Sequence, residues 1–451
     1  MHQLENSRVT VIGAARSGIG VAKLLRSKGA RVLVSDQRPD DQLREAYADL
    51  AAIGVALETS GHSDRVFEAS LIVLSPGVPS DAPVVREAMR REIPIVSELE
   101  VASWFCKGSM IAVTGSNGKT TTTTLIGRIL GDAKKKHVVA GNIGTAFSSV
   151  VLDMAEEEIA VLEVSSFQLD HCETFRPNIS VLLNITEDHM DRYLHSLERY
   201  AASKAKVFAN QDAGDTLIYC ADDPWTVKVV ANARSRKLPF SYTNPQLEGA
   251  WIQNSAIQIQ LNSQRHEILP IDQMTIRGVH NSYNAMAAVL AGFLSGVGPA
   301  SLRATLRNFK GVEHRLEFVR ELNGVQYFND SKATNVDSVR YAIRSFANPI
   351  ILLLGGRDKG NDYSVIKSLV QKHVKAVVAI GESAQKVEAA FRDVVPVSLV
   401  SSMEEAVSSA SRLAEKGDLV LLSPACASFD WFTNYEHRGR VFKELVNHMK
   451  S

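Results

Sequence analysis

Short apolar runs alternate with amphipathic segments along almost the whole chain. The runs are rich in Val, Ile and Leu, as in Ile350–Leu354, and the segments between them have helical spacing. This alternation is typical of parallel sheets whose strands are joined by crossover helices, so we predict an α/β protein. Because 451 residues exceed what one hydrophobic core normally holds, two to four domains are expected.

The composition argues against several classes of protein. Lys and Arg together number 50, as do Asp and Glu, so nothing in the charge balance indicates nucleic acid or an anionic membrane. No apolar run approaches the ~20 residues of a membrane span, and the first residues have no signal-peptide pattern. The four cysteines lack the spacing of a metal site. We therefore expect a reduced, cytoplasmic protein without nucleic-acid partners or membrane insertion.

The alternating pattern divides into three regions, which we assign to an N-terminal, a central and a C-terminal domain. Their predicted boundaries are residues 1–98, 99–311 and 312–451. The predicted strands are 8–12, 31–35, 71–74, 110–113, 159–164, 179–184, 256–261, 350–354, 376–380 and 419–422. Helices are predicted at 281–294 and 299–307.

A phosphate-binding loop is predicted in the central region. Residues 114–121 read TGSNGKTT, between an apolar run and a helical pattern. In such a strand–loop–helix unit, backbone N–H groups and the helix N-terminus point at one anion. Lys119 can reach the β- and γ-phosphate oxygens, and the Thr120 hydroxyl can ligate Mg²⁺. Val113 replaces the first glycine of the common motif, but the flanking context favours ATP over a plain Gly/Thr-rich turn.

A second glycine loop follows the first predicted strand. Residues 13–18 (GAARSG) open a helix, and Asp36 ends the next strand about 20 positions later, as in dinucleotide-binding units. Because Ala15 replaces the middle glycine, we predict a nucleotide of some kind rather than NAD. A plain βαβ turn is an equal alternative. Residues 75–78 form a further loop at a strand end, either at a ligand crevice or as an ordinary Pro-Gly turn.

Acidic and basic residues follow two strands of the central region. Glu163 lies in an apolar strand, where a carboxylate is costly unless it is paired or metal-bound, so we predict a Mg²⁺ ligand. A solvated carboxylate at the strand end is the alternative. Residues 184–193 (NITEDHMDRY) fit a second metal, an acidic substrate or a solvated, capped turn. Helical spacing alone does not distinguish Lys204 from Lys206.

Three loops of the last region carry candidate binding groups. Residues 329–335 (NDSKATN) could hold a ribose and a phosphate, although the turn is also a good helix N-cap. Residues 355–360 combine glycines with two cations that could meet carboxylates, or form a flexible basic turn. The small residues before Ser428 suggest close packing or a substrate pocket.

Taken together, these motifs resemble those of the bacterial Mur ligases. The matching segments are TGSNGKTT (114–121), GNIG (141–144), EVSSFQL (163–169), NITEDHMDRY (184–193), HR (314–315), NDSKATN (329–335) and SPACASFDWFTNYEHRG (423–439). NDSKATN and SPACASFD are similar to the branch that adds D-glutamate, and the DNPR motif of the relatives that add meso-diaminopimelate is absent. The resemblance implies a Rossmann-like N-terminal domain for UDP, a P-loop ATPase-like central domain with a mostly parallel sheet for ATP, and a Rossmann-like C-terminal domain that closes over both.

The implied activity is ATP-dependent amide ligation in peptidoglycan precursor synthesis. ATP would phosphorylate the carboxylate of UDP-N-acetylmuramoyl-L-alanine (UDP-MurNAc-L-Ala), and the amine of D-glutamate would attack the acyl phosphate. Two Mg²⁺ ions and a lysine carbamylated by CO₂ are implied as cofactors, and a monomer is expected. The alternatives are another amide ligase of the superfamily that uses a different amino acid or folate, a nucleotide-binding regulatory module, and an NAD oxidoreductase.

The resemblance assigns roles residue by residue. The implied catalytic residues are Lys119, His189 and Lys204. The implied metal ligands are Thr120, Glu163, His189 and Lys204, the last of them carbamylated. The implied ATP site contains Gly115, Ser116, Asn117, Gly118, Lys119, Thr120, Thr121, Asn142, Asn281, Asn284, Arg315, Asp330 and Lys332. The implied UDP site contains Ser17, Asp36 and Arg38. The implied D-glutamate site contains Thr334, Lys359, Ser428 and Tyr435, the last in place of the family's phenylalanine.

Overall fold

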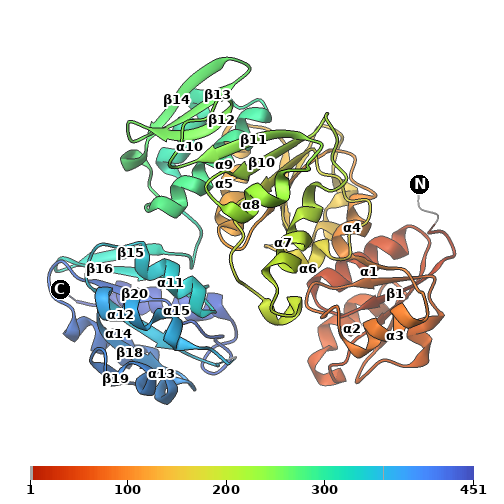
Figure 1. The fold of residues 1–451 in the computed structure, drawn as a ribbon. Helices are drawn as coiled ribbons and strands as arrows, with labels where there is room; N and C mark the ends of the chain where they lie inside the picture. Colours follow the sequence, from red (N-terminus) through yellow and green to blue (C-terminus); the bar gives the residue numbers. More distant parts are fainter. Residues whose placement is uncertain (1–3, 359, 451) are drawn as a thin grey trace. The chain divides into compact units, whose positions relative to one another are not determined.

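A computed structural model describes residues 4–358 and 360–450 of the chain (Figure 1). The predicted D-glutamate contact Lys359 therefore lies outside the described residues. Within the described part, no helix is both long enough and apolar enough to cross a membrane.

The chain forms two compact units. The first contains the residues up to Met274 together with Asn281–Phe309, and the second contains Thr275–His280 together with the residues from Lys310 onward. Three sheets lie within these units, and most of their neighbouring strands are parallel. The predicted α/β class is thereby confirmed. The predicted three-domain boundaries remain predictions, and α4 begins at Glu98, the last residue assigned to the N-terminal domain.

Strands and helices alternate through the first hundred residues of the first unit (Figure 1). The elements are β1 (Arg8–Ile12), α1 (Arg16–Ser27), β2 (Arg31–Ser35), α2 (Arg44–Ala51), β3 (Ala56–Glu58), the 3-10 helix η2 (Asp64–Glu68), β4 (Leu71–Leu74), α3 (Pro83–Arg90), β5 (Ile95–Ser97) and α4 (Glu98–Ser103).

The first sheet is parallel throughout, with the order β3-β2-β1-β4-β5. Successive side chains of β1 serve opposite faces, because Val11 packs in the core on one face and Ile12 in the core on the other. Burial on both faces explains why the strands read as continuous apolar runs. The direction of the strand order changes between β1 and β4, so the loops that follow these two strands lie together at the carboxyl edge.

The rest of the first unit builds a nine-stranded sheet. Its strands are β6 (Ser109–Thr114), β7 (His137–Gly141), β8 (Ile159–Glu163), β9 (Ile179–Leu182), β10 (Thr216–Cys220), β11 (Arg236–Ser241), β12 (Gly249–Gln253), β13 (Ala256–Leu261) and β14 (Gln264–Pro270). Its helices are α5 (Lys119–Asp132), α6 (Ser166–Leu169), α7 (Leu197–Ala205), α8 (Pro224–Val230), α9 (Val279–Leu294) and α10 (Pro299–Asn308), with the 3-10 helix η5 (Met190–Tyr193).

Within this sheet β6 lies between β9 and β8, in the order β14-β13-β12-β11-β10-β9-β6-β8-β7. In this order, neighbouring strands from β12 to β7 are parallel. Strands β13 and β14 add an antiparallel edge next to β12. The loops after β6, β8 and β9 therefore leave the same edge of the sheet side by side. These are the loops on which the sequence predicts phosphate and metal binding.

The second unit contains a six-stranded sheet with helices on both faces. Its strands are β15 (Glu317–Leu322), β16 (Val325–Asn329), β17 (Ile350–Gly355), β18 (Val374–Ile380), β19 (Val397–Leu399) and β20 (Leu419–Leu422). Its helices are α11 (Val336–Arg344), α12 (Lys367–His373), α13 (Ala384–Phe391), α14 (Met403–Leu413) and α15 (Tyr435–His448). The order is β15-β16-β20-β17-β18-β19, and only β15 pairs antiparallel. Leu352 packs with α11 to α13, whereas Ile351 packs with α14 and α15.

Candidate active site

The loop between β6 and α5 has the geometry of a phosphate cradle. Gly115 and Gly118 have φ angles of +152° and +86°, which side chains disfavour. A Cβ atom on Gly118 would lie 2.2 Å from Oδ1 of Asn284. Helix α5 starts directly after this glycine, at Lys119. The predicted strand–loop–helix unit is therefore present, with the helix N-terminus at the loop.

Residues after β9 hold the loop in this shape. The backbone N–H of Asn117 donates to Oδ1 of Asn184 at 2.8 Å, and Nδ2 of Asn184 donates back to the Asn117 carbonyl at 3.0 Å. The Ser116 hydroxyl donates to the Thr186 carbonyl at 2.8 Å and accepts from the Thr186 N–H at 2.9 Å. The sequence pattern at 184–193 indicates a second metal, an acidic substrate or a solvated, capped turn, and it does not reveal this positioning role.

Two lysines share one carbonyl of the loop. Nζ of Lys119 and Nζ of Lys204 each donate to the Gly115 carbonyl at 2.8 Å. Lys204 is only 1% exposed, and its Nζ lies 4.4 Å from the centre of the Tyr200 ring. Burial, and then the positive charge of Lys119, hold the pKa of Lys204 well below its usual range. The structure therefore presents Lys204 as a buried amine beside the phosphate cradle, where burial and Lys119 disfavour its protonated form.

Glu163 is a buried carboxylate with an unused oxygen. It ends β8, pairs with Val113 across the sheet and is 3% exposed. Its Oε1 accepts from Nδ2 of Asn142 at 3.2 Å, whereas Oε2 has no hydrogen-bond partner among the described residues. A buried carboxylate oxygen without a partner is costly, and a hard cation such as Mg²⁺ would satisfy it. The residues present thus fit a metal ion at this place.

His189 belongs to the same electrostatic neighbourhood. It lies at the start of η5 with a φ of +53°, and its side chain is 48% exposed. Burial lowers the pKa of His189, against the opposing effect of Asp188. The positive charges of Lys119 and Arg192 lower it further, and this favours the neutral ring that can bind a metal. Thr120, the other predicted ligand on the loop, is 3% exposed in the first turn of α5.

Helix α9 brings two residues of the implied ATP site to the loop. Oδ1 of Asn284 accepts from the Thr122 hydroxyl at 3.3 Å, and its Nδ2 donates to Oδ1 of Asn281 at 3.2 Å. The hydroxyl of Tyr283 donates to Oδ2 of Asp222 at 2.7 Å and ties the helix to the end of β10. Asp222 was not singled out from the sequence, where an acidic residue in a turn carries no distinguishing signal.

The glycine loop after β1 is held by Asp36. Oδ2 of Asp36 accepts from the Ala14 N–H and from the Arg38 guanidinium, each at 2.7 Å. Burial alone would raise the pKa of Asp36, but the hydrogen bonds from Arg38 and Ala14 lower it. The hydroxyl of Ser75 donates to the Gly13 carbonyl at 2.8 Å, so the two carboxyl-edge loops touch. Ser17 is half-buried in the first turn of α1.

The second unit brings together four predicted nucleotide and amino-acid contacts. Burial raises the pKa of Asp330 to about 7, against the opposing charge of Arg315. Asp330 accepts from the Ser423 hydroxyl at 2.8 Å. Nζ of Lys332 lies 5.7 Å from the ring centre of Tyr435.

The remaining predicted contacts of this unit lie on its loops. Nε of Arg315 is buried without a hydrogen-bond partner among the residues that the structure describes. Ser428 is 2% exposed on the loop between β20 and α15. Thr334 is half-buried just before the N-cap of α11.

A buried arginine that the sequence analysis missed joins two of these loops. Arg438 is 1% exposed. Its guanidinium donates to the hydroxyl and carbonyl of Ser331 at 2.9 and 2.8 Å, and to the carbonyls of Cys426 and Ala427 at 3.1 and 3.3 Å. Ser331 in turn donates to the Tyr435 carbonyl at 2.8 Å. Arg438 therefore fixes the NDSKATN and SPACASFD loops against each other.

We expect Arg438→Ala to lower the free energy of unfolding of the second unit by at least about 3 kcal/mol, because several buried carbonyls would lose their donor. Arg440→Ala, at an exposed position two residues later, should change it by less than about 0.5 kcal/mol. Calorimetric melting of the three proteins measures both effects. Equal melting of wild type and Arg438→Ala would show that the two loops do not depend on this side chain.

Models of three protein domains match consecutive parts of this chain. Residues 7–97 match the "Mur ligase MurD-like, N-terminal domain", residues 113–292 the "Mur ligase middle domain", and residues 314–426 the "Mur ligase, glutamate ligase domain". Together they span most of the sequence.

Named relatives match over nearly their full length. UDP-N-acetylmuramoylalanine–D-glutamate ligase from Chlorobaculum parvum is 46% identical, with 99% of both chains covered. The enzymes of the same name from Chloroherpeton thalassium and Salinibacter ruber are each 44% identical, with 98% of both chains covered.

Solved structures share the fold at low sequence identity. UDP-N-acetylmuramate–alanine ligase from Thermotoga maritima superposes with a TM-score of 0.59 at 19% identity, covering 99% of this chain and 100% of its own. MurF from Acinetobacter baumannii gives 0.61 at 16% identity, covering 93% and 91%.

Proposed function

The chain belongs to the Mur ligase family, and on that basis we propose that it joins D-glutamate to UDP-MurNAc-L-Ala with ATP, in peptidoglycan precursor synthesis. The substrates follow from relatives of that name at 44–46% identity over the whole length. The observation that carries the chemistry is the phosphate loop, with Lys119, Lys204 and the unpartnered oxygen of Glu163 gathered around it.

The reaction needs an activated carboxylate, because a free carboxylate is a poor acyl donor. A carboxylate oxygen of the L-alanyl group attacks the γ-phosphorus of ATP, and ADP leaves. The amine of D-glutamate then attacks the acyl carbon, and the C–O bond to phosphate breaks as the amide forms and the amine loses its proton. Phosphoryl transfer is governed by positioning and by neutralisation of charge on the transferred group. Lys119 and the backbone N–H groups of residues 115–121 are suited to that role.

Four residues would hold two Mg²⁺ ions: Thr120, Glu163, His189 and Lys204. Bound Mg²⁺ would offset the negative charge on the phosphoryl oxygens. We propose, from the resemblance to the family, that Lys204 carries a carbamate. A neutral amine attacks CO₂, a proton is released, and the lysine side chain becomes an anionic, carboxylate-like ligand. The burial of Lys204 supports this proposal, because burial and the nearby charge of Lys119 lower the pKa of this amine and so favour the neutral form that reacts with CO₂.

We further propose the remaining assignments as predictions from the family. Ser17, Asp36 and Arg38 would bind the UDP part within residues 1–98. ATP would occupy residues 99–311, with Asn142, Asn281 and Asn284, and would be met by Arg315, Asp330 and Lys332. Thr334, Lys359, Ser428 and Tyr435 would bind D-glutamate within residues 312–451. We expect the reaction in the cytoplasm, where ATP is supplied.

A panel of amino acids tests the proposed substrate. The purified protein is incubated with ATP, Mg²⁺, UDP-MurNAc-L-Ala and one amino acid at a time, and both phosphate release and the mass of the product are recorded. We expect phosphate and an amide product with D-glutamate, and neither with L-glutamate, L-alanine or L-lysine. Amide formation with a different amino acid would assign the chain to another ligase of the family. ATP turnover without any amide product would favour a regulatory nucleotide-binding module.

A further inference from the structure

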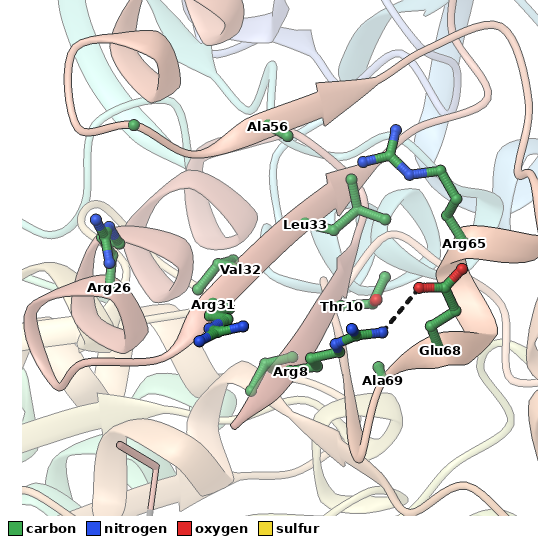
Figure 2. A pocket seen from close by; sticks show the side chains of 12 residues that line it. Arg8, Thr10, Arg26, Arg31, Val32, Leu33, Ala56, Arg65, Glu68 and Ala69 are labelled. Carbon is green, nitrogen blue, oxygen red and sulfur yellow. Dashed lines mark hydrogen bonds and ion pairs between the residues drawn. The ribbon is translucent and has the colours of Figure 1, made fainter. Parts of the chain in front are cut away.

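A basic pocket lies at the edge of the first sheet opposite its carboxyl-edge loops. It has a volume of about 430 Å³ and is lined by residues at the amino-terminal ends of β1, β2 and β3 and by η2 (Figure 2). In a parallel sheet the amino-terminal and carboxyl-terminal ends form opposite edges. The pocket is therefore distinct from the Gly13 loop, which Asp36 of the proposed UDP site holds in place. It is also distinct from the phosphate loop, which belongs to another sheet.

The pocket has an excess of positive charge. Four arginines line it, each from a different segment: Arg8 from β1, Arg26 from α1, Arg31 from β2 and Arg65 from η2. Among the described residues that line it, Glu68 is the only carboxylate, so four positive charges face one negative charge. Glu68 is already engaged by Arg8 at 2.9 Å, the dashed contact in Figure 2.

Two of the arginines have guanidinium N–H donors that no described residue accepts. In the described part of the chain, Arg31 and Arg65 form no ion pair and no side-chain hydrogen bond. Glu58 is close enough for the charge of Arg65 to act on its pKa, but its oxygens accept from Ser35 at 2.8 Å and from Ser63 at 2.5 and 2.8 Å. Glu58 therefore acts on Arg65 electrostatically but forms no ion pair with it in the described structure.

The strand register forces two arginines together. Arg8 and Arg31 are direct partners in the parallel pairing of β1 with β2, so their side chains leave neighbouring positions of the sheet. Like charges at neighbouring strand positions destabilise a sheet. In Figure 2 the Arg8 guanidinium points towards Glu68, whereas Arg31 lies beside Val32 and Arg65 lies on the side of Leu33. An anion bound among these guanidinium groups would remove the repulsion.

We propose that this pocket binds a small phosphate-bearing ligand, and that it is a second anion site of the protein. Guanidinium groups present paired N–H donors that match phosphate oxygens, and they remain charged at all physiological pH values. The volume of about 430 Å³ accommodates a pyrophosphate group or a nucleoside monophosphate. The proposal does not depend on the ligase reaction.

Methyl NMR of the full-length protein tests the proposal site by site. The methyl signals of Val32 and Leu33 report on the pocket, and those of Leu183, whose side chain lies against the phosphate loop, report on the first anion site. Phosphate, pyrophosphate and a nucleoside monophosphate are titrated separately without Mg²⁺, which distinguishes an inorganic from a nucleotide ligand. We expect saturable shifts of Val32 and Leu33 with at least one of them.

Two substituted proteins complete the test. In Arg31→Ala/Arg65→Ala the affinity at Val32 and Leu33 should fall at least about tenfold, while the Leu183 response is unchanged. Arg44→Ala, an exposed arginine of α2 outside the pocket, should behave as wild type. The proposal is overturned if Val32 and Leu33 do not respond up to about 10 mM ligand, an affinity too weak for a specific site. Equal shifts in the double variant, or equal shifts with chloride, would indicate an adventitious ion only.

A stability measurement gives an independent answer. Without added anions, Arg31→Gln should melt at a higher temperature than wild type, because the cross-strand repulsion is removed. Pyrophosphate should raise the melting temperature of wild type more than that of Arg31→Gln. A lower melting temperature for Arg31→Gln without anions would contradict the repulsion on which the proposal depends.

Discussion

Replacing Lys204 with alanine is expected to abolish amide synthesis, with a loss of at least about 10²–10³-fold in kcat. Lys204 is fully buried and donates to the Gly115 carbonyl, so its terminus lies beside the loop that we propose to hold the phosphates of ATP. Substitution removes the proposed carbamate and leaves an apolar space next to that loop. Initial rates of phosphate release, measured with all three substrates, give the loss directly.

Chemical rescue decides which charge Lys204 supplies. If the functional group at position 204 is a carbamate, short carboxylic acids such as formate and acetate should partly restore the activity of Lys204→Ala. Short alkylamines should not restore it. Lys206→Ala is the matched control, because Nζ of Lys206 donates to the Asp170 carbonyl at 2.6 Å instead of the loop, and that variant should keep most of its activity. Rescue by amines alone, or full activity in Lys204→Ala, would refute the carbamate.

Glu163→Gln is expected to lower kcat by at least about 10²-fold and to weaken the dependence of the rate on Mg²⁺. The substitution preserves the shape of the side chain but removes the negative charge from the buried oxygen that lacks a protein partner. Rates are measured as a function of Mg²⁺ concentration at saturating ATP. Melting temperatures with and without Mg²⁺ and an ATP analogue show whether the cation still stabilises the folded state.

The matched control for this variant is Glu156→Gln. Glu156 is an exposed carboxylate just before β8 and should leave both the rate and the Mg²⁺ dependence unchanged. If Glu163→Gln has the Mg²⁺ dependence of wild type, Glu163 is not a metal ligand, and its unused oxygen needs another explanation.

Much of the fold follows from patterns within single segments. The strands are buried on both faces, so Val11 and Ile12, or Ile351 and Leu352, read as continuous apolar runs and predict parallel sheets. The loops after these strands necessarily gather at the carboxyl edge. The phosphate loop was predictable for the same reason, since its glycines, Lys119 and the flanking strand and helix are consecutive in the sequence.

The rest depends on contacts between distant segments, which spacing does not encode. Lys204 and Lys206 are equivalent in a helical pattern, and only the packing of α7 near the Gly115 carbonyl buries the first of them. Asn184 acts through hydrogen bonds to a loop 67 positions away. Arg438 looks like one cation among several on a charged helix, yet it is enclosed by two loops. A family resemblance supplied Lys204, whereas Asn184 and Arg438 emerged only from the folded chain.

We propose that the carboxylate of the UDP substrate is phosphorylated before the amide forms. UDP-MurNAc-L-Ala labelled with ¹⁸O in its terminal carboxylate tests this directly, because the oxygen that attacks ATP leaves with the phosphate. Each phosphate released during D-glutamyl product formation should carry one ¹⁸O atom from the carboxylate. Unlabelled phosphate accompanying the amide product, or the label in AMP, would contradict phosphorylation of the substrate carboxylate.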